Sequence, residues 1–124
     1  MEITGVDFVA VPSTDWKRSR AFYVETLGLR PDANGQAEFW VGQTCFGIYE
    51  PPTFGMTFAP QTTAHLALHV DDVAGARTEL EAKGVEFLGE TFDTGVCKMA
   101  FFRDPDGNDL MLHSRYAPRE GAGA

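Results

Sequence analysis

Apolar and polar residues alternate in two stretches of the sequence that line up residue by residue. The first is GVDFVAVPSTD at 5–15 and the second is TTAHLALHVDD at 62–72, and both end in an acid. Alternation over this length predicts a strand with one buried face. Because the pattern occurs twice, we predict two similar modules, each of which opens with such a strand.

A helical pattern follows each of these strands. After Asp15 and again after Asp72, apolar residues recur every three or four positions. A carboxylate at this place can accept hydrogen bonds from the free N–H groups of the first turn, so both acids are predicted N-caps. Gly28 and Gly84 follow the last turn, where a left-handed residue often ends a helix. One helix is therefore expected in each module.

Further strands complete each module. In the first half, a short, weak strand near 29–33 precedes AEFWV at 37–41 and TCFGIYE at 44–50, which are joined by a Gly42–Gln43 hairpin. The second half contains three more strands, which are VEFLGE at 85–90, CKMAFF at 97–102 and DLMLHS at 109–114. The Pro and Gly of DPDG predict a tight turn between the last two.

These elements predict an α+β fold, a single domain over 1–124 made of two βαβββ modules. The first module is expected at 5–50 and the second at 64–116. The C-terminal tail, 117–124, ends in small residues and is expected to be disordered.

The segment between the modules, 51–63, is predicted to be a linker or a flap. Phe54, Met56 and Phe58 are large and apolar, and they alternate with small residues between prolines. They could cover an edge of the core, or they could form a mobile lid that buries the surface of a ligand.

Composition and charge narrow the classes of partner. The chain has 10 basic and 18 acidic residues and a net charge of −8, which argues against nucleic acid and against an anionic membrane surface. Cys45 and Cys97 lie far apart and form no C-x-x-C motif, so we expect both to be reduced. The N-terminus does not resemble a signal peptide, and no apolar stretch is long enough to span a membrane. A cytoplasmic protein is expected.

The sequence resembles the vicinal oxygen chelate superfamily, which includes glyoxalase I, extradiol dioxygenases, and fosfomycin and bleomycin resistance proteins. The resemblance extends from residue 5 to about 116 and rests on VDFVAVPSTDWKRSRAFYVETLGL, HLALHVDDVAGA and above all FFRDPDGNDLML. It implies two paired modules whose curled mixed sheets form a cleft, and often a homodimer. It does not specify the chemistry, because one fold can host many functions.

The resemblance also implies where a divalent metal would be held in the enzymes of the family. The four corresponding positions are occupied here by Phe8, Phe46, His65 and Met111. Phenylalanine cannot bind a metal, and the thioether of methionine suits copper(I) rather than Mg, Mn, Fe(II) or Zn. One imidazole is too few, since such sites usually supply about three protein ligands. We therefore expect no metal and no other cofactor.

The three histidines are also a candidate zinc site. His65 and His69 lie four residues apart on one predicted strand, which separates them by roughly 13 Å, too far to share an ion. His69 and His113 could approach each other, but a pair of imidazoles alone is not a zinc site.

Alternation counted from Phe8 gives most of the predicted ligand-binding set, and Trp40 is a further candidate although parity does not settle its side. We expect aromatic and aliphatic side chains, three imidazoles and one acid around the cleft, joined by the large residues of the linker. This set is Phe8, Ala10, Trp40, Phe46, Ile48, Glu50, Phe54, Met56, Phe58, His65, Ala67, His69, Met111 and His113. Aromatic rings and thioethers suit a flat organic ligand. Alternatively, this face is simply the core of a small sandwich.

Three functions are compatible with this pattern. The first is metal-independent binding that sequesters a small aromatic or hydrophobic molecule, such as a drug or natural product, as in the bleomycin resistance branch. The second is a glyoxalase-like lyase or isomerase, or an extradiol-type dioxygenase, with His65 or His69 as general base and Glu50 as a further candidate. Glu50 could equally be a solvated acid at the end of a strand. The third is an interaction module without a ligand.

Overall fold

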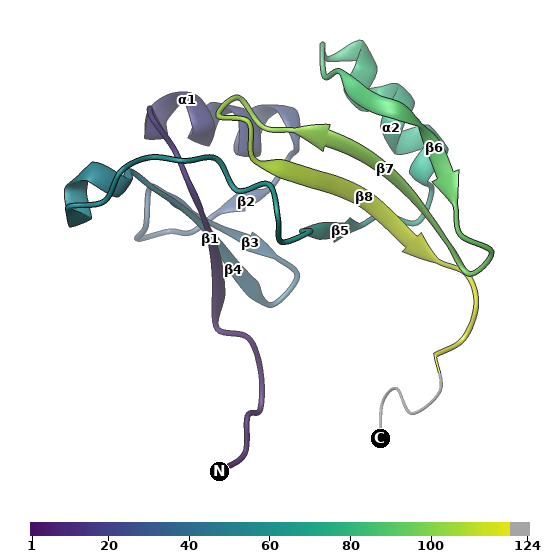
Figure 1. Ribbon diagram of the computed structural model, residues 1–124, viewed down its shortest axis with the longest axis horizontal. Helices are drawn as coiled ribbons and strands as arrows, with labels where there is room; N and C mark the ends of the chain where they lie inside the picture. Colours follow the sequence, from purple (N-terminus) through teal and green to yellow (C-terminus); the bar gives the residue numbers. More distant parts are fainter. Residues whose placement is uncertain (120–124) are drawn as a thin grey trace. The chain divides into compact units, whose positions relative to one another are not determined.

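The computed structural model describes residues 1–119 and divides the chain into two compact units (Figure 1). Unit 1 comprises Met1–Thr62 together with the turn Asp104–Asn108. Unit 2 comprises Thr63–Arg103 and the described residues from Asp109 onward. Each unit contains one α-helix and a four-stranded mixed sheet, which confirms the predicted α+β fold.

The sheet of unit 1 has the order β1–β4–β3–β2. Its strands are β1 (Phe8–Pro12), β2 (Arg30–Pro31), β3 (Glu38–Val41) and β4 (Thr44–Tyr49). β1 is parallel to β4, and the β2–β3 and β3–β4 pairs are antiparallel. A parallel neighbour needs a long crossover, and helix α1 (Trp16–Ala21) lies in the connection that follows β1.

Helix α1 begins as its sequence predicts, and the helical segment that it opens ends before Gly28. The Asp15 carboxylate accepts a hydrogen bond from the backbone N–H of Arg18 at 3.3 Å. A π-helical turn at Phe22–Thr26 extends the helix, and Gly28 follows with a left-handed φ of +74°. Tyr23 of the π-helical turn is fully buried, stacked on Phe39 at 5.7 Å and packed on Phe46 at 4.9 Å between ring centroids.

The turn Asp104–Asn108 completes the core of unit 1. The Tyr23 hydroxyl donates to Oδ2 of Asp104 at 2.6 Å, and Nδ2 of Asn108 donates to the carbonyl of Pro12 at 2.8 Å. Gly107 has a φ of +86°, which is a backbone conformation that favours glycine. The DPDG motif is thus a turn, as predicted, and its polar side chains are part of the core.

Unit 2 repeats the same architecture with the sheet order β5–β8–β7–β6. Its elements are β5 (Ala67–His69), α2 (Val73–Ala82), β6 (Phe87–Asp93), β7 (Cys97–Arg103) and β8 (Asp109–Arg115). β5 is parallel to β8, as β1 is to β4. The Asp72 carboxylate caps α2 by accepting from the N–H of Gly75 at 3.0 Å, and Gly84 follows the helix with a φ of +93°.

Several boundaries differ from the prediction. β5 begins at Ala67, so His65 precedes the strand rather than lying within it. β6 continues to Asp93, because the register shifts between Leu88 and Phe92, around a left-handed Gly89. Such a bulge lets a strand continue past a residue that cannot pair.

The predicted tail is only partly described. Tyr116 and Ala117 both donate backbone hydrogen bonds to the carbonyl of Val96, whereas the part of the tail at 120–124 lies outside the described residues. Within the described part of the chain, no helix has the length and apolar character that crossing a membrane requires.

Candidate functional site

The strand register assigns side chains to the two faces of the unit 1 sheet. One row across β1, β4 and β3 is Phe8, Cys45 and Trp40, and the next row is Ala10, Gly47 and Glu38. Directly paired residues on neighbouring strands share a face, and residues two apart on one strand share it too. These six residues therefore lie on one face, which we call the open face of unit 1.

The opposite face of this sheet is the core. Phe39 and Phe46 pair with each other across β3 and β4 and pack against Tyr23. The prediction that Phe46 lies on the same face as Phe8 is therefore wrong, since β1 pairs Val9, not Phe8, with Phe46. A difference of one residue in register moves a side chain to the other face of a sheet.

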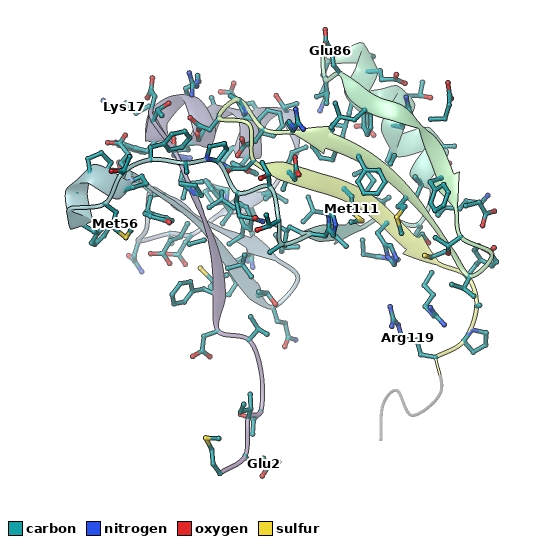
Figure 2. The ribbon with its side chains drawn as sticks, in the orientation of Figure 1. Glu2, Lys17, Met56, Glu86, Met111 and Arg119 are labelled. Atoms are coloured by element: carbon teal, nitrogen blue, oxygen red, sulfur yellow. The ribbon has the colours of Figure 1, made fainter. Side chains whose placement is uncertain are left out.

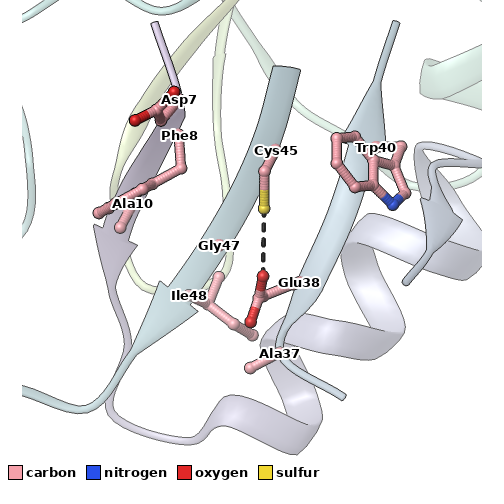
Figure 3. A pocket seen from close by; sticks show the side chains of 9 residues that line it. All are labelled: Asp7, Phe8, Ala10, Ala37, Glu38, Trp40, Cys45, Gly47 and Ile48. Atoms are coloured by element: carbon pink, nitrogen blue, oxygen red, sulfur yellow. Dashed lines mark hydrogen bonds between the residues drawn. The ribbon is translucent and has the colours of Figure 1, made fainter. Parts of the chain in front are cut away.

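A hollow of about 420 Å³ lies on the open face (Figure 3). Its lining residues are Asp7, Phe8, Ala10, Ala37, Glu38, Trp40, Cys45, Gly47 and Ile48. Phe8 is 66% exposed, which is unusual for a phenylalanine. Ile48, though buried and of the same parity as Phe46, also contributes to the lining. Pockets for small organic ligands typically have volumes of about 300–1,000 Å³.

Two hydrogen bonds fix polar groups at this hollow. The Cys45 thiol donates to Oε2 of Glu38 at 3.3 Å, as the dashed line in Figure 3 shows. Partial burial and then the neighbouring Glu38 raise the pKa of Cys45, so the thiol keeps its proton. The indole Nε1 of Trp40 donates to Asp32 at 3.0 Å. A backbone hydrogen bond from Asn34, followed by this indole bond, lowers the pKa of Asp32.

A second hollow of about 490 Å³ adjoins the first. Its aromatic lining is Trp16, Tyr49 and Phe54, and it shares Ala37, Glu38 and Ile48 with the first hollow. The rings of Tyr49 and Phe54 meet edge to face at 6.2 Å, and Phe54 is 68% exposed in the 3-10 helix Pro51–Phe54.

Glu50, the acid predicted for the cleft, also lines this second hollow. Its Oε2 atom accepts a hydrogen bond from the backbone N–H of Trp16 at 2.9 Å, which binds it to the start of α1. Met56 is 49% exposed and Phe58 is half-buried, but neither lines either hollow. The predicted ligand-binding role of these two residues stays a prediction.

The sheet of unit 2 carries the remaining predicted site residues. The register pairs Ala67 with Met111 and His69 with His113, so these four residues share a face, as alternation predicted. Figure 2 labels Met111 on β8. The His65 ring lies edge-on to Phe101 with centroids 6.3 Å apart. His69 pairs with Asp71 at 2.9 Å on the exposed surface. Binding of a ligand by these residues stays a prediction.

The residues present do not fit the divalent metal that the resemblance implies for enzymes of that superfamily. Phe8 has no atom that can bind a metal. Phe46 lies on the core face, and its neighbour on the open face of unit 1, Gly47, has no side chain. Within residues 1–119, no three His, Cys, Asp or Glu side chains are grouped closely enough to hold an ion. We therefore derive no chemistry from a metal.

Sequence reasoning missed several residues of the hollows. Asp7, Glu38, Cys45 and Gly47 were not predicted, nor was Trp16 in the second hollow. Glu38 has the same parity as Trp40 on β3, so fixing the side on which Trp40 lies would have found it. Predicting Cys45 and Gly47 would have required the register of β1 on β4, which pairs residues that are far apart in the sequence.

Known proteins share this fold and part of this sequence. Residues 5–112 match the model of the Glyoxalase/Bleomycin resistance protein/Dioxygenase superfamily. The uncharacterised protein YaeR of Escherichia coli is 32% identical, over 89% of this chain and 95% of its own. TnmS3, an antibiotic binding protein from a Streptomyces species, is 30% identical with a TM-score of 0.72, covering 93% of this chain and 98% of its own.

A more distant neighbour shares the fold alone. A lactoylglutathione lyase from Agrobacterium tumefaciens has a TM-score of 0.73 at 18% identity, covering 91% of this chain and 95% of its own. Taken with the match over residues 5–112, these findings show that the chain belongs to the glyoxalase/bleomycin resistance protein/dioxygenase superfamily.

Proposed function

We propose that this protein binds and sequesters a small aromatic or hydrophobic organic molecule, and that it does so without a metal. The observation that carries this proposal is the hollow on the open face of unit 1. There, an exposed phenylalanine and an oriented tryptophan border a space of about 420 Å³.

The floor of this hollow suits a flat molecule. Ala10 and Gly47 pair directly across β1 and β4, so the sheet carries almost no side-chain bulk there. Phe8 and Trp40 belong to the adjacent row and can contact the faces or edges of a bound ring. Burial of apolar surface contributes roughly 25 cal/mol per Å², so covering the exposed Phe8 ring favours binding.

A relative that binds an antibiotic supports the same proposal. TnmS3 is described as an antibiotic binding protein and is 30% identical to this chain over nearly its whole length. Binding without chemical change also needs no metal ligands, which agrees with the residues at the four family positions. A drug or natural product is therefore the class of ligand that we propose.

Tryptophan fluorescence tests the proposal. The chain has two tryptophans, and the variant Trp16→Phe leaves only Trp40, at the first hollow. Titration with the neutral probe 1-naphthalenemethanol should change Trp40 emission saturably, at one probe per chain, and chromatography should recover the probe unchanged. Consumption of the probe, or no saturable change, would contradict sequestration at this site.

A substitution in the floor should block binding, and a substitution on the other face of the same strand provides the matched control. A Cβ at Gly47 would meet only Ala37 O at 3.6 Å and Glu38 Cγ at 4.0 Å, so Gly47→Val should fold and fill the hollow. Thr44→Val places the same side chain on the opposite face of the same strand, with little change in volume, and should bind the probe normally. Homodimer assembly, a cytoplasmic location and the absence of nucleic-acid or membrane partners stay predictions.

A further inference from the structure

The two hollows on unit 1 are parts of one continuous surface. They share Ala37, Glu38 and Ile48, so the lining of one passes directly into the lining of the other. Each end has its own aromatic residues, which are Phe8 and Trp40 at the first hollow and Trp16, Tyr49 and Phe54 at the second. A molecule with two ring groups could therefore occupy both ends at once.

The strand register places Glu38 between these ends. Trp40 belongs to the row of Phe8, Glu38 to the row of Ala10 and Gly47, and Tyr49 to the row of Pro12. Successive rows on one face are about 6.6 Å apart, since a strand rises about 3.3 Å per residue. The two aromatic rows therefore flank the Glu38 row, and a short linker between two rings would cross Glu38.

The charge of this surface favours a cationic linker. The first hollow is lined by Asp7 and Glu38 and the second by Glu38 and Glu50, and among the described residues neither lining includes a lysine or arginine. The Cys45 thiol, which donates to Glu38, is a weak and neutral partner.

The positively charged side chains near this surface lie beside groups other than Glu38. Arg30 pairs with Trp40 across β2 and β3, and its charge helps to lower the pKa of Asp32 after the hydrogen bonds from Asn34 and Trp40. The Nζ atom of Lys17 lies 5.8 Å from the centre of the Trp16 ring. Glu38 thus remains without a charged partner among the residues that line the two hollows.

We propose that the ligand of this surface is an elongated amine in which two ring groups flank a protonated nitrogen, and that Glu38 binds this nitrogen. The inference rests on the proposed binding function and specifies its ligand class. A carboxylate that pairs with an ammonium group forms a charge-assisted hydrogen bond, which is stronger than a neutral one. Glu38 is then the residue that determines charge specificity.

Three naphthalene probes that differ in charge test the role of Glu38. Calorimetry should show that 1-naphthylmethylamine binds about tenfold more tightly than 1-naphthalenemethanol, and 1-naphthoate more weakly than either. Glu38→Gln should remove the preference for the amine, so that the amine and the alcohol bind the variant with similar affinity. Glu79→Gln removes the same charge from an exposed site on α2 and should preserve the preference.

A two-ring probe tests the length. N-benzyl-1-naphthylmethylamine should bind more tightly than 1-naphthylmethylamine, and Phe54→Ala should reduce this gain. Equal binding of the amine and the alcohol would overturn the role of Glu38, and an unchanged gain in Phe54→Ala would overturn the second ring site. Failure of all probes, the neutral alcohol included, would instead overturn the proposed function itself.

Discussion

At the scale of single residues, buried polar groups of unit 1 are satisfied by specific partners. Asp104 is 5% exposed and accepts hydrogen bonds from the Tyr23 hydroxyl and from the backbone N–H groups of Asp106 and Asn108. A buried carboxylate without such donors would be costly. The stability of unit 1 should therefore depend on each of these donors.

Removing the Tyr23 hydroxyl should destabilise the fold. Tyr23→Phe keeps the aromatic packing but leaves Asp104 with one donor fewer, so we expect the free energy of unfolding to fall by about 1–3 kcal/mol. Urea denaturation at neutral pH measures this loss. Tyr49→Phe, whose ring is half-buried against Phe54, is the control and should change stability little.

The same hydroxyl should make stability depend on alkaline pH. Burial, and then the charge of Asp104, raise the pKa of Tyr23 far above its ordinary value of 10.0. Above pH 10 the unfolded chain therefore loses this proton while the folded chain keeps it, and stability falls as pH rises. The alkaline decline should be shallower in Tyr23→Phe, and equal slopes would contradict the buried, protonated tyrosine.

The thiol of the open face provides a residue-scale test of the site. Burial and then Glu38 raise the pKa of Cys45, so Glu38→Gln should lower it partway and speed alkylation of Cys45 by iodoacetamide at mildly alkaline pH. Peptide mapping separates Cys45 from the buried Cys97. A slower reaction in the variant would contradict the contact between the thiol and Glu38.

At the scale of elements, local sequence determined what could be predicted. The N-caps Asp15 and Asp72 and the left-handed Gly28 and Gly84 were all predicted correctly, because caps and helix ends depend on neighbours within a few residues. Phe46 was assigned to the wrong face, because alternation gives two sets of residues without saying which set faces the core. Only the pairing of β1 with β4 settles that choice.

The cap of α2 should contribute measurably to stability. Asp72→Ala removes the acceptor for the N–H of Gly75 and should lower the free energy of unfolding by about 1 kcal/mol. The neighbouring Asp71 is exposed and pairs with the exposed His69, so Asp71→Ala should have a much smaller effect. Thermal denaturation of both variants measures the two losses of stability. Equal losses would contradict the capping role of Asp72.

At the scale of the whole molecule, the turn Asp104–Asn108 has a special place in the chain. It belongs to unit 1, although the strands that it joins, β7 and β8, belong to unit 2. Asp106 has a fully buried side chain that accepts from Thr14 and Ser19 and forms an ion pair with Arg18 at 2.6 Å. Sequence reasoning identified this motif as a turn but could not reveal these contacts, which span most of the chain.

Asp106→Asn should therefore destabilise the protein, by about 1–3 kcal/mol at neutral pH, because one oxygen that accepts these bonds becomes a donor. Asp109→Asn breaks a more exposed pair with Arg103 and is the control. Burial opposes ionisation of Asp106, but hydrogen bonds from Ser19 and Thr14 outweigh it and lower the pKa. The stability that ionised Asp106 contributes is thus lost as pH falls below about 4. At that pH, the denaturation midpoints of Asp106→Asn and of the unmodified protein should converge.

Calorimetric titration of the EDTA-treated protein with 1-naphthalenemethanol tests the central claim most directly. The account predicts one binding event per chain that is unaffected by EDTA, is lost in Gly47→Val and is retained in Thr44→Val. It would be contradicted by binding that requires an added divalent metal, by equal binding in Gly47→Val, or by no binding in the unmodified protein.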